Sequence, residues 1–364
     1  MLLDKIIAVV VPAFNEESQI GIVIETMPSF VDRIVIVNDN SNDSTKEKIL
    51  KYLSSEHNKI TSMLSKRETI KTFHNDAEIM LQEYNEKELE LFPKSEIVNE
   101  NPETDRIILI DNCVNIGVGG SIARGYKWCK DNNIDCTAVM AGDAQMDPDE
   151  LKAICTPVIS DGVDYVKGNR LIHGIASNYI PKTRFFGNSV LSILTKIASG
   201  YWRISDTQTG YTAISLSALN SIKLHKIYKR YGMPNDMLVK LNTAYCTIRE
   251  IPIKPVYRVG EKSKMKLFKV IPAITYLLFK SFFKRLWIKY FLKDFHPLFI
   301  LYNLSFILGI AWLRYVVKVT YILIKGSNAS FETLLAFVFL GVTSIQFLIF
   351  AMWMDIQDNE RLYK

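Results

Sequence analysis

Apolar residues in the first two thirds of the chain occur in short runs that alternate with amphipathic stretches. The runs at residues 6–11, 33–37 and 106–110 are rich in β-branched residues, and each leads into a polar cluster. A fourth apolar run precedes Asp143. Buried strands that alternate with helices are typical of α/β proteins, so we predict an α/β domain with a mostly parallel sheet over residues 1–253.

The composition changes after this domain. Between Lys254 and Lys293 the chain has eleven Lys or Arg and a single acid, Glu261. Apolar residues at helical spacing in the same segment, 254–296, predict amphipathic helices that lie on a bilayer. They are Phe268, Ile271, Ile274, Leu277, Leu278, Phe282 and Phe283. We assign the lysines around them, with Arg285, to the anionic membrane surface.

Two long apolar runs follow, Pro297–Leu313 and Leu334–Met354. The second has 21 residues without a charge, close to the roughly 20 that cross a bilayer as a helix. We predict two transmembrane helices, a hairpin over residues 297–354, followed by a tail at 355–364. A helical hairpin buried in a soluble core is the alternative.

Residues 46–104 are charged with both signs and poor in glycine. An apolar stripe at steps of three and four predicts an amphipathic helix there. The stripe consists of Ile70, Phe73, Ala77, Met80 and Tyr84. We interpret the stretch as a helical insertion between two strands, either a decoration packed on the domain or a partner-binding element.

Charge and cysteine content exclude some classes. The 364 residues carry a net charge of +6, and the basic residues coincide with apolar, membrane-type sequence, which argues against a nucleic-acid partner. The five cysteines are scattered without a Cys-x-x-Cys pair, which indicates reduced cytosolic thiols. The first apolar run is too short for a signal peptide.

Polar clusters follow the first two predicted strands. Asn15 and Glu16 follow the first strand, and Asp39 follows the second. Ligands of parallel α/β sheets bind at the carboxyl ends of strands, so Asp39 is a candidate acceptor for nucleoside hydrogen bonds. Asp and Asn also cap helices and form turns, which is the structural alternative.

Two further motifs follow the third and fourth strands. The glycine-rich turn at 115–120 precedes a helix, and Gly117 in it serves either close phosphate approach or tight packing. Asp143 and Gln145 provide oxygen ligands two residues apart, which suits Mg²⁺ or Mn²⁺. Asp147 before Pro148 is typical of a helix cap.

The order of these motifs resembles the inverting GT-A glycosyltransferases of glycosyltransferase family 2, in the branch of dolichyl-phosphate mannose synthase and polyprenyl-phosphate relatives. The matching residues are Val11-Pro12-Ala13-Phe14-Asn15-Glu16-Glu17, Asn38-Asp39 with Ser41, Asp43 and Thr45, Asn115, Gly117, Gly119 and Gly120, Asp143, Gly168-Asn169-Arg170, Asp206 to Tyr211, Asn235-Asp236, and Arg258, Gly260, Ser263 and Lys264. The chain departs from the family at Ala141 and Asn38, where many members have an acid.

The resemblance implies a Rossmann-like GT-A domain and transfer of a sugar from a nucleotide diphosphate to a polyprenyl phosphate, dolichyl or undecaprenyl. It implies that Pro12, Ala13, Asn15, Glu16, Asp39, Gly117 and Asp143 bind the nucleotide sugar. It implies that Asp143 and Gln145 bind Mg²⁺ or Mn²⁺, that Asp143 and Asp236 are catalytic, and that Arg170, Arg184, Arg258, Ser263 and Lys264 bind the acceptor phosphate.

Several choices stay open at this point. UDP-sugars are favoured over GDP-mannose as donors, and a homo-oligomer is left open. A hydroxyl group on a lipid-linked saccharide or a polysaccharide is the alternative acceptor, and a membrane scaffold with a degenerate transferase domain is an alternative of another class. By the positive-inside rule we expect an integral membrane protein whose catalytic domain is cytoplasmic.

Overall fold

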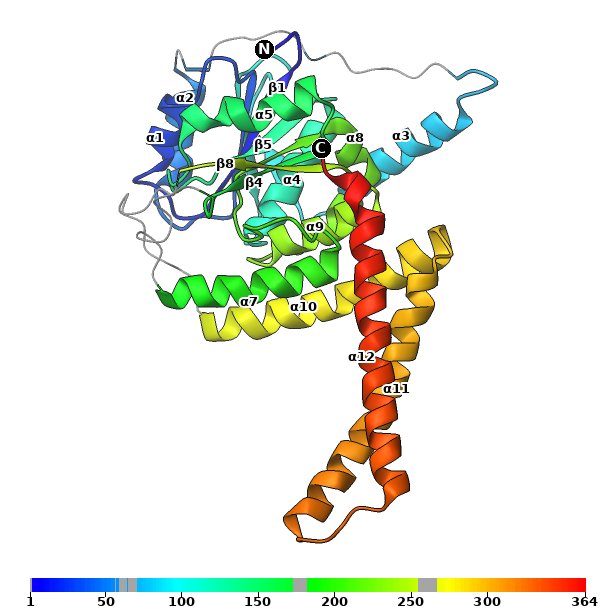
Figure 1. Ribbon diagram of the computed structural model, residues 1–364. Coiled ribbons are helices and arrows are strands. Elements are labelled where there is room, and N and C mark those ends of the chain that lie inside the picture. The colour runs from blue at the N-terminus through cyan, green and yellow to red at the C-terminus, as the bar shows by residue number, and fades with distance from the viewer. Residues whose placement is uncertain (1, 56, 59–63, 65–70, 173–181, 255–266) are drawn as a thin grey trace.

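An eight-stranded sheet forms the centre of the computed structural model, which describes all residues except 1, 56, 59–63, 65–70, 173–181 and 255–266 (Figure 1). Residues 182–188 and 267–270 are described only as helical backbone. The strands are β1 (Ile7–Ala13), β2 (Arg33–Asn38), β3 (Ser95–Ile97), β4 (Ile107–Asn112), β5 (Cys136–Val139), β6 (Tyr165–Asn169), β7 (Thr212–Ser215) and β8 (Ile248–Pro252). Their order across the sheet is β3-β4-β2-β1-β5-β7-β6-β8.

The sheet is parallel at its centre and mixed beyond it. Strands β4, β2, β1 and β5 run parallel, and β6 pairs parallel with β8. Strand β7 runs antiparallel between β5 and β6, and the short β3 runs antiparallel to β4 at one edge. The predicted α/β fold is confirmed, and the antiparallel strands make the sheet less parallel than the pattern indicated.

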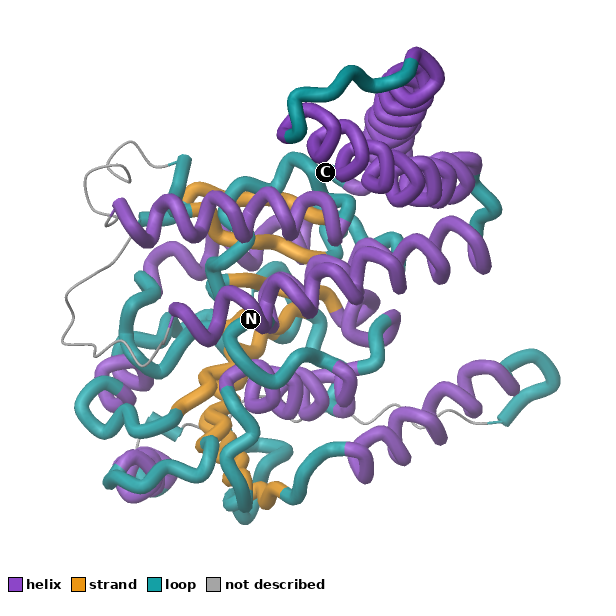
Figure 2. The backbone as a smooth tube through the Cα atoms, turned by 90° about the horizontal axis from the view of Figure 1, so that it is seen from below, coloured by secondary structure: helices purple, strands orange, loops and turns teal. Residues whose placement is uncertain are grey.

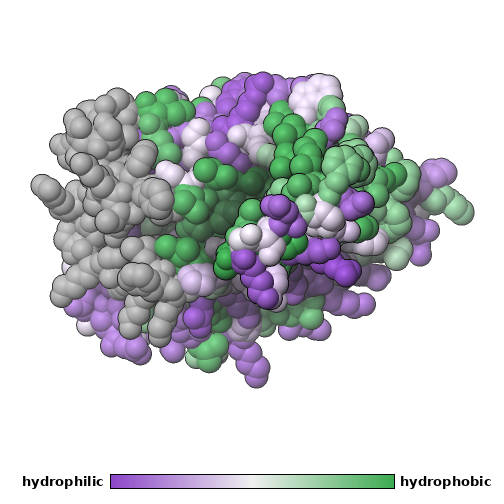
Figure 3. Space-filling view, turned by 60° about the horizontal axis from the view of Figure 1, so that its bottom comes forward, coloured by the Kyte–Doolittle hydropathy of each residue, from purple (hydrophilic) through white to green (hydrophobic). Residues whose placement is uncertain are grey.

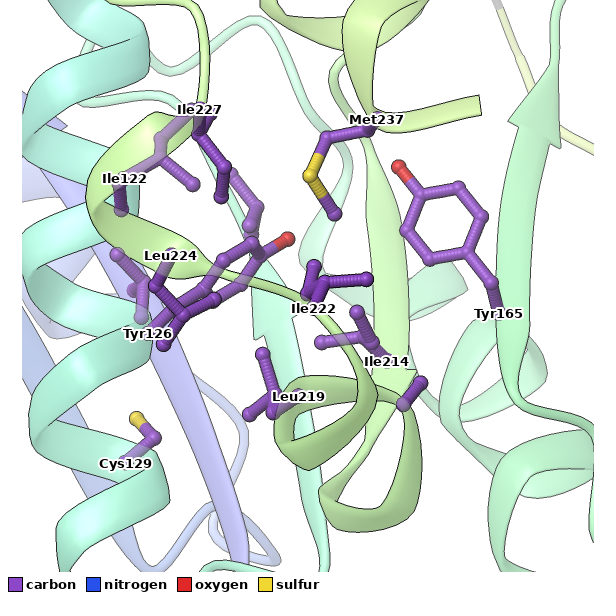
Figure 4. Packing of buried hydrophobic residues seen from close by; sticks show 14 of the residues in the cluster. Ile122, Tyr126, Cys129, Tyr165, Ile214, Leu219, Ile222, Leu224, Ile227 and Met237 are labelled. Carbon is purple, nitrogen blue, oxygen red and sulfur yellow. The ribbon is translucent and has the colours of Figure 1, made fainter. Parts of the chain in front are cut away.

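Helices cover both faces of the sheet because the buried residues of each strand alternate in direction. In β1, Ile7, Val9 and Val11 pack with one cluster, whereas Ala8 and Val10 pack with another. The first cluster includes residues of α1 (Ile20–Glu25), α2 (Thr45–Leu53) and α5 (Leu151–Ser160). The second includes residues of α4 (Val118–Asp131), α8 (Leu216–Ser221), η3 (Leu224–Lys226) and α9 (Met233–Thr243), as Figure 4 shows around Tyr126 and Met237.

The stretch 46–104 is helical only in part. It contains most of α2, then α3 (Asp76–Glu88), η1 (Leu89–Leu91) and the strand β3. Its apolar stripe does not pack on the domain, because Phe73 and Met80 are 99% and 70% exposed. The last residue of α3, Glu88, is buried and attaches the helix to the domain. Ile70 lies outside the described residues.

Two further helices, α7 (Lys182–Ser199) and α10 (Leu267–Trp287), lie side by side on the underside of the domain (Figures 1 and 2). A π-helical segment, η4 (Ile288–Lys293), joins α10 to the hairpin of α11 (Pro297–Ile324) and α12 (Phe331–Asn359). A separate apolar cluster, which includes Leu191, Leu286 and Leu298, holds these elements together. The helices that were expected after the sheet domain are therefore present.

The hairpin projects away from the domain (Figure 1). Its helices have 28 and 29 residues, so each is more than 40 Å long at about 1.5 Å per residue. By length and composition both could cross a membrane. Only 6% of the apolar window of α11 is buried inside the protein, which a soluble core hairpin would not show.

A buried polar cluster holds the base of the hairpin. Arg285 and Asp355 are fully buried, and the guanidinium donates two hydrogen bonds of 2.8 Å to the carboxylate. Lys289 is also buried and pairs with Asp358 at 3.2 Å. The assignment of Arg285 and Lys289 to the membrane surface is therefore wrong, since both residues fasten the hairpin to the domain.

Candidate active site

A small cavity of about 80 Å³ lies beside the carboxyl end of β5. Residues from four parts of the chain meet there: the turn after β5, the end of β6, the loop before β7 and the end of β8. They are Ala141, Asp143, Gln145, Met146, Asp147, Glu150, Arg170, Thr209, Gly210, Tyr211, Ile253 and Lys254. The cavity thus contains three of the expected site residues, Asp143, Gln145 and Arg170.

The turn after β5 directs Asp143 and Gln145 into this cavity. Ala144 between them has a φ of +57°, a left-handed conformation that costs energy for a residue with a side chain. The backbone N–H of Gln145 donates to Asp143 Oδ1 at 3.1 Å. The N–H of Gly142 donates to the carbonyl of Pro12 at 3.3 Å, so the end of β1 supports the turn.

Asp147 and Glu150 occupy the rim of the cavity in structural roles. Asp147 Oδ1 accepts from the N–H of Asp149 at 3.0 Å and so caps η2 (Pro148–Glu150), in agreement with the capping alternative. Glu150 Oε1 accepts from the N–H of Lys254 at 2.7 Å. Lys254 Nζ pairs with Asp147 Oδ2 at 3.4 Å. The chain therefore enters segment 255–266 from the rim of this cavity.

Arg170 faces the cavity from the end of β6. Asp206 receives two hydrogen bonds from its guanidinium, from Nε at 2.8 Å and from Nη2 at 3.1 Å. Asp206 is 3% exposed; burial alone would raise the pKa of its carboxyl, but the pairing with Arg170 lowers it. The orientation of Arg170 is therefore fixed by a carboxylate 36 positions away in the sequence.

Lys167 and Glu250 lie beneath the same loop, and sequence reasoning missed both. Lys167 is fully buried in β6, its ammonium group donates to the carbonyl of Thr209, and burial lowers its pKa to about 8. Glu250 accepts from the N–H groups of Ser205 and Asp206 at 2.9 and 3.0 Å. The sequence feature that could have revealed Lys167 is the presence of a lysine within an apolar strand.

Asp39 and Gly117 contact each other, and each also contacts other residues within the protein. Asp39 accepts from the N–H groups of Ile116 and Gly117, both at 2.8 Å, and from the side chain of Asn112 at 3.0 Å. A Cβ on Gly117, whose φ is +81°, would lie 2.5 Å from the carbonyl oxygen of Lys229. Of the two interpretations of this glycine, the structure supports tight packing.

Side chains of the loop after β2 support the loop after β1. The consecutive N–H groups of Asn15, Glu16 and Glu17 donate to Ser41, Thr45 and Asp43, at 3.0, 2.9 and 3.2 Å respectively. The Ser-x-Asp-x-Thr spacing therefore builds a platform of two loops. Ala13 belongs to it, because its carbonyl accepts from the N–H of Asp39 at 2.9 Å.

Asp236 does not line the described cavity. It lies in the first turn of α9, is 5% exposed, and accepts from the N–H of Tyr228 at 2.8 Å. It also pairs with Lys240 one turn later. These contacts anchor α9. The remaining predicted acceptor residues, Arg258, Ser263 and Lys264, lie outside the described residues, as does the side chain of Arg184.

The donor set of the cavity fits a hard divalent cation with few protein ligands. Asp143 supplies a carboxylate and Gln145 a carboxamide oxygen within one cavity, and Mg²⁺ fills its other positions with water and substrate phosphates. No group of three or more His, Cys, Asp or Glu side chains suited to a metal occurs among the described residues. Asp143 and Gln145 would supply the protein ligands of such a site.

Comparison with known proteins indicates the class. The model of the family described as Glycosyl transferase family 2 matches residues 8–69. The chain is 29% identical, over 70% of its length and 87% of the relative, to a UDP-N-acetylglucosamine–dolichyl-phosphate N-acetylglucosaminyltransferase of Methanococcus voltae. It is 24% identical to an uncharacterized protein of Methanocaldococcus jannaschii, over 69% of its length and 82% of that relative.

Solved structures of glucosyl-3-phosphoglycerate synthase from Mycobacterium tuberculosis are also similar. One superposes with a TM-score of 0.48 at 14% identity, covering 78% of this chain and 81% of that one. Another, in complex with Mn²⁺, uridine diphosphate and glucosyl-3-phosphoglycerate, has a TM-score of 0.47 at 16% identity and covers 78% and 80%.

The family match and the relative from Methanococcus voltae support one class of enzyme, the glycosyltransferases. Within that class, the similarity is to family 2, whose model matches residues 8–69 and whose motif order the sequence resembles.

Proposed function

We propose that the protein transfers a sugar from a UDP-sugar to the phosphate of a polyprenyl phosphate, dolichyl or undecaprenyl, at a membrane surface. The observation that carries the proposal is that one cavity holds Asp143 and Gln145, suited to a metal-bound diphosphate, together with Arg170, suited to a second anion. The name of the relative from Methanococcus voltae, with UDP-N-acetylglucosamine as donor and dolichyl phosphate as acceptor, supports this pair of substrates.

The nucleotide sugar binds, in this proposal, along the ends of β1, β2 and β5. Pro12, Ala13, Asn15 and Glu16 form the wall between the platform of two loops and the turn that carries Asp143. Asp39 and Gly117 maintain the shape of this wall, because each is already engaged in contacts within the protein. Asp143 and Gln145 hold Mg²⁺ or Mn²⁺, which when bound neutralises the charge of the departing diphosphate.

The acceptor phosphate binds at Arg170. A guanidinium group recognises phosphate well because it donates parallel hydrogen bonds. Asp206 accepts hydrogen bonds from Nε and one terminal nitrogen of Arg170, so the guanidinium group and its charge are held in a fixed orientation. By the family resemblance Arg184, Arg258, Ser263 and Lys264 contribute as well, and the segment with the last three begins at the rim of the cavity.

A phosphate acceptor needs no general base. Its second pKa is about 6, so a phosphate monoester is largely dianionic at neutral pH and attacks the anomeric carbon directly, on the face opposite the diphosphate, with inversion. A hydroxyl acceptor would need a base close to the reacting atoms. Asp236 does not line the cavity and is engaged with Tyr228 and Lys240, which favours the phosphate acceptor and gives Asp236 a positioning role through α9.

The underside of the domain suits a bilayer. Exposed apolar side chains gather there on α7 and α10: Val190, Ile193, Tyr276 and Phe279. Figure 3 shows this apolar, hollowed surface beside the base of the hairpin. We propose that α11 and α12 cross the membrane and that the domain lies on the cytoplasmic side, where positively charged segments such as 254–293 are retained.

The proposal is tested by release of UDP. The purified protein in detergent should release UDP from UDP-N-acetylglucosamine when polyprenyl phosphate is added, and the matched lipid alcohol, polyprenol, should give no release. No reaction should occur when GDP-mannose replaces the UDP-sugar as donor. Chelation of divalent cations should also abolish the reaction. Release with polyprenol but not with its phosphate would favour the hydroxyl-acceptor alternative, and release with neither would favour the scaffold.

A kinetic split tests the acceptor residues. Arg170→Ala and Arg258→Ala should raise the KM for polyprenyl phosphate by roughly ten- to a hundredfold, the value of a charge-assisted hydrogen bond, and leave the KM for the UDP-sugar nearly unchanged. An equal change in both KM values would show that these arginines do not read the acceptor.

A further inference from the structure

The last ten residues of the chain, Asp355–Lys364, return to the catalytic domain after the hairpin (Figure 1). We call them the C-terminal segment. Leu362 is buried in the core cluster of α4 and α9. Tyr363 forms a parallel bridge with Ile248 in β8. The segment is therefore packed into the domain.

The C-terminal segment binds the loop that precedes Asp206. The indole N–H of Trp202 donates to Asp355 Oδ2 at 3.2 Å. The backbone N–H of Arg203 donates to the hydroxyl of Tyr363 at 2.9 Å, and the guanidinium of Arg203 pairs with Glu360. Two adjacent residues of the loop thus bond to three residues of the segment.

The same loop also orients Arg170, the arginine that lines the cavity. Ser205 and Asp206 follow Arg203 after one intervening residue, Ile204, and Glu250 accepts hydrogen bonds from both of their N–H groups. Asp206 then fixes the guanidinium of Arg170 through two hydrogen bonds. The contacts are continuous from the end of α12, through loop 200–206, to the cavity.

The anchor of this chain of contacts is buried and multiply hydrogen-bonded. Asp355, which bonds to Trp202, is fully buried at the end of α12. It also accepts two hydrogen bonds of 2.8 Å from Arg285 and one of 2.7 Å from the hydroxyl of Tyr290. The position of Asp355 is therefore fixed by the residues at the base of the hairpin. Loop 200–206 is held in turn by its hydrogen bond to Asp355.

We infer that the C-terminal segment positions the acceptor half of the active site, with Trp202 and Tyr363 as positioning residues that act on Arg170 through loop 200–206. This inference rests on the proposed function, in which Arg170 binds the acceptor phosphate. The two membrane helices, in addition to anchoring the enzyme, set the position of the residue that meets the lipid headgroup.

The donor half of the site lies outside this chain of contacts. Asp143 and Gln145 lie in the turn after β5, which the end of β1 supports. A loosened loop 200–206 should therefore weaken acceptor binding and spare donor binding. A merely structural role of the segment would instead affect both substrates through loss of folded protein.

The variant Trp202→Phe/Tyr363→Phe removes two hydrogen bonds between the loop and the C-terminal segment and keeps an aromatic side chain at both positions. Tyr245→Phe is the matched control, because it removes a 2.6 Å hydrogen bond from a tyrosine hydroxyl to Asp294 near the base of the hairpin without touching the loop. We expect the double variant to raise the KM for polyprenyl phosphate roughly five- to thirtyfold, the value of two hydrogen bonds. The KM for the UDP-sugar should stay within about twofold, and the control should change neither.

Hydrogen exchange of residues 200–206 provides the second readout, and it should become faster in the double variant only. An unchanged acceptor KM overturns the inference, whether or not exchange becomes faster, and so do equal shifts in both KM values or the same response from Tyr245→Phe. A wild-type enzyme that transfers nothing to polyprenyl phosphate refutes the proposed function instead, so the two failures are distinguishable.

Discussion

Single residues of the recognised motifs divide into two groups. Ser41, Asp43 and Thr45 each accept a backbone N–H from the neighbouring loop, and Asp39 holds the glycine turn. Asp143 instead lines the cavity. In the proposed function, the first group shapes the nucleotide side of the site, and Asp143 contacts the substrates. Substitutions in the two groups should therefore differ in their effect on stability and on turnover.

In the proposed function, Asp143 is the carboxylate on which metal binding rests. Asp143→Ala should reduce transfer at least about a hundredfold, because metal stabilisation of the leaving group contributes several kcal/mol. The thermal unfolding midpoint should stay close to that of the wild type. Asp149→Asn, an exposed acid six positions later that does not line the cavity, should retain full activity. Normal turnover of Asp143→Ala in the presence of a chelator would contradict the metal role.

Lys167 predicts a pH-dependent contribution to stability. Burial lowers its pKa from 10.5 to about 8, so between these values the unfolded chain binds more protons at this residue than the folded protein does. The free energy of unfolding therefore rises with pH across that window. Relative to Lys167→Met, the wild type should gain stability from about pH 8 to about pH 10, measured by denaturant unfolding in detergent. A constant difference between the two proteins would refute the shift.

The sequence allowed Asp143 to be predicted at the cavity because it follows an apolar strand at the edge where ligands bind, and Arg170 was predicted from the family resemblance. It did not reveal that Asp206 orients Arg170, since the two are 36 positions apart and only the folded sheet brings them together. The role of Gly117 was undecided for a similar reason. The backbone of Lys229, which excludes a side chain at Gly117, belongs to a distant loop.

At the scale of elements, strands were predicted more reliably than the long insertion. Runs such as 6–11 and 106–110 are almost wholly apolar, and β1 and β4 occupy those places. The periodic pattern in 70–84 did predict a helix, and α3 covers much of it. Its apolar side is exposed, because periodicity predicts an apolar face but not what covers that face.

Glu88 attaches α3 to the domain and provides a test at this scale. Its buried carboxylate accepts from Lys130 at 3.2 Å and from the N–H of Leu224 at 2.8 Å. Glu88→Ala leaves Lys130 buried without its partner and should lower the free energy of unfolding by about 3 kcal/mol. Glu86→Ala, an exposed acid two residues earlier, should change it by less than about 0.5 kcal/mol. Equal effects in chemical denaturation would show that Glu88 does not anchor the helix.

At the scale of the whole molecule, the hairpin and the domain form one connected unit. Arg285, Lys289 and Asp355 are buried where they meet, although the charges of Arg285 and Lys289 indicated the membrane surface. A buried ion pair between α10 and α12 is invisible to a composition argument, because its members are 70 positions apart. The first residue of α11 and the last residue of α12 both lie next to the domain. If each helix crosses the membrane once, the C-terminal segment is on the same side as the catalytic domain.

Cysteine labelling tests this topology. In a Cys113→Ser background, which removes the exposed cysteine and leaves four buried ones, Ser327→Cys in the turn between α11 and α12 should react with an impermeant reagent outside intact cells. Arg361→Cys in the C-terminal segment should react only after the membrane is opened. The reverse pattern, or no labelling of Ser327→Cys under either condition, would contradict the proposed hairpin.

The central claim is that the acceptor atom is a phosphate oxygen of a polyprenyl phosphate, and the mass of the lipid product tests it most directly. The purified protein, incubated with UDP-N-acetylglucosamine, a divalent cation and polyprenyl phosphate, should yield a lipid heavier by one sugar residue. Fragmentation of this lipid should release a sugar phosphate, because the new bond joins the anomeric carbon to the phosphate. A product that carries the sugar on a hydroxyl group, or a lipid of unchanged mass, would contradict the account.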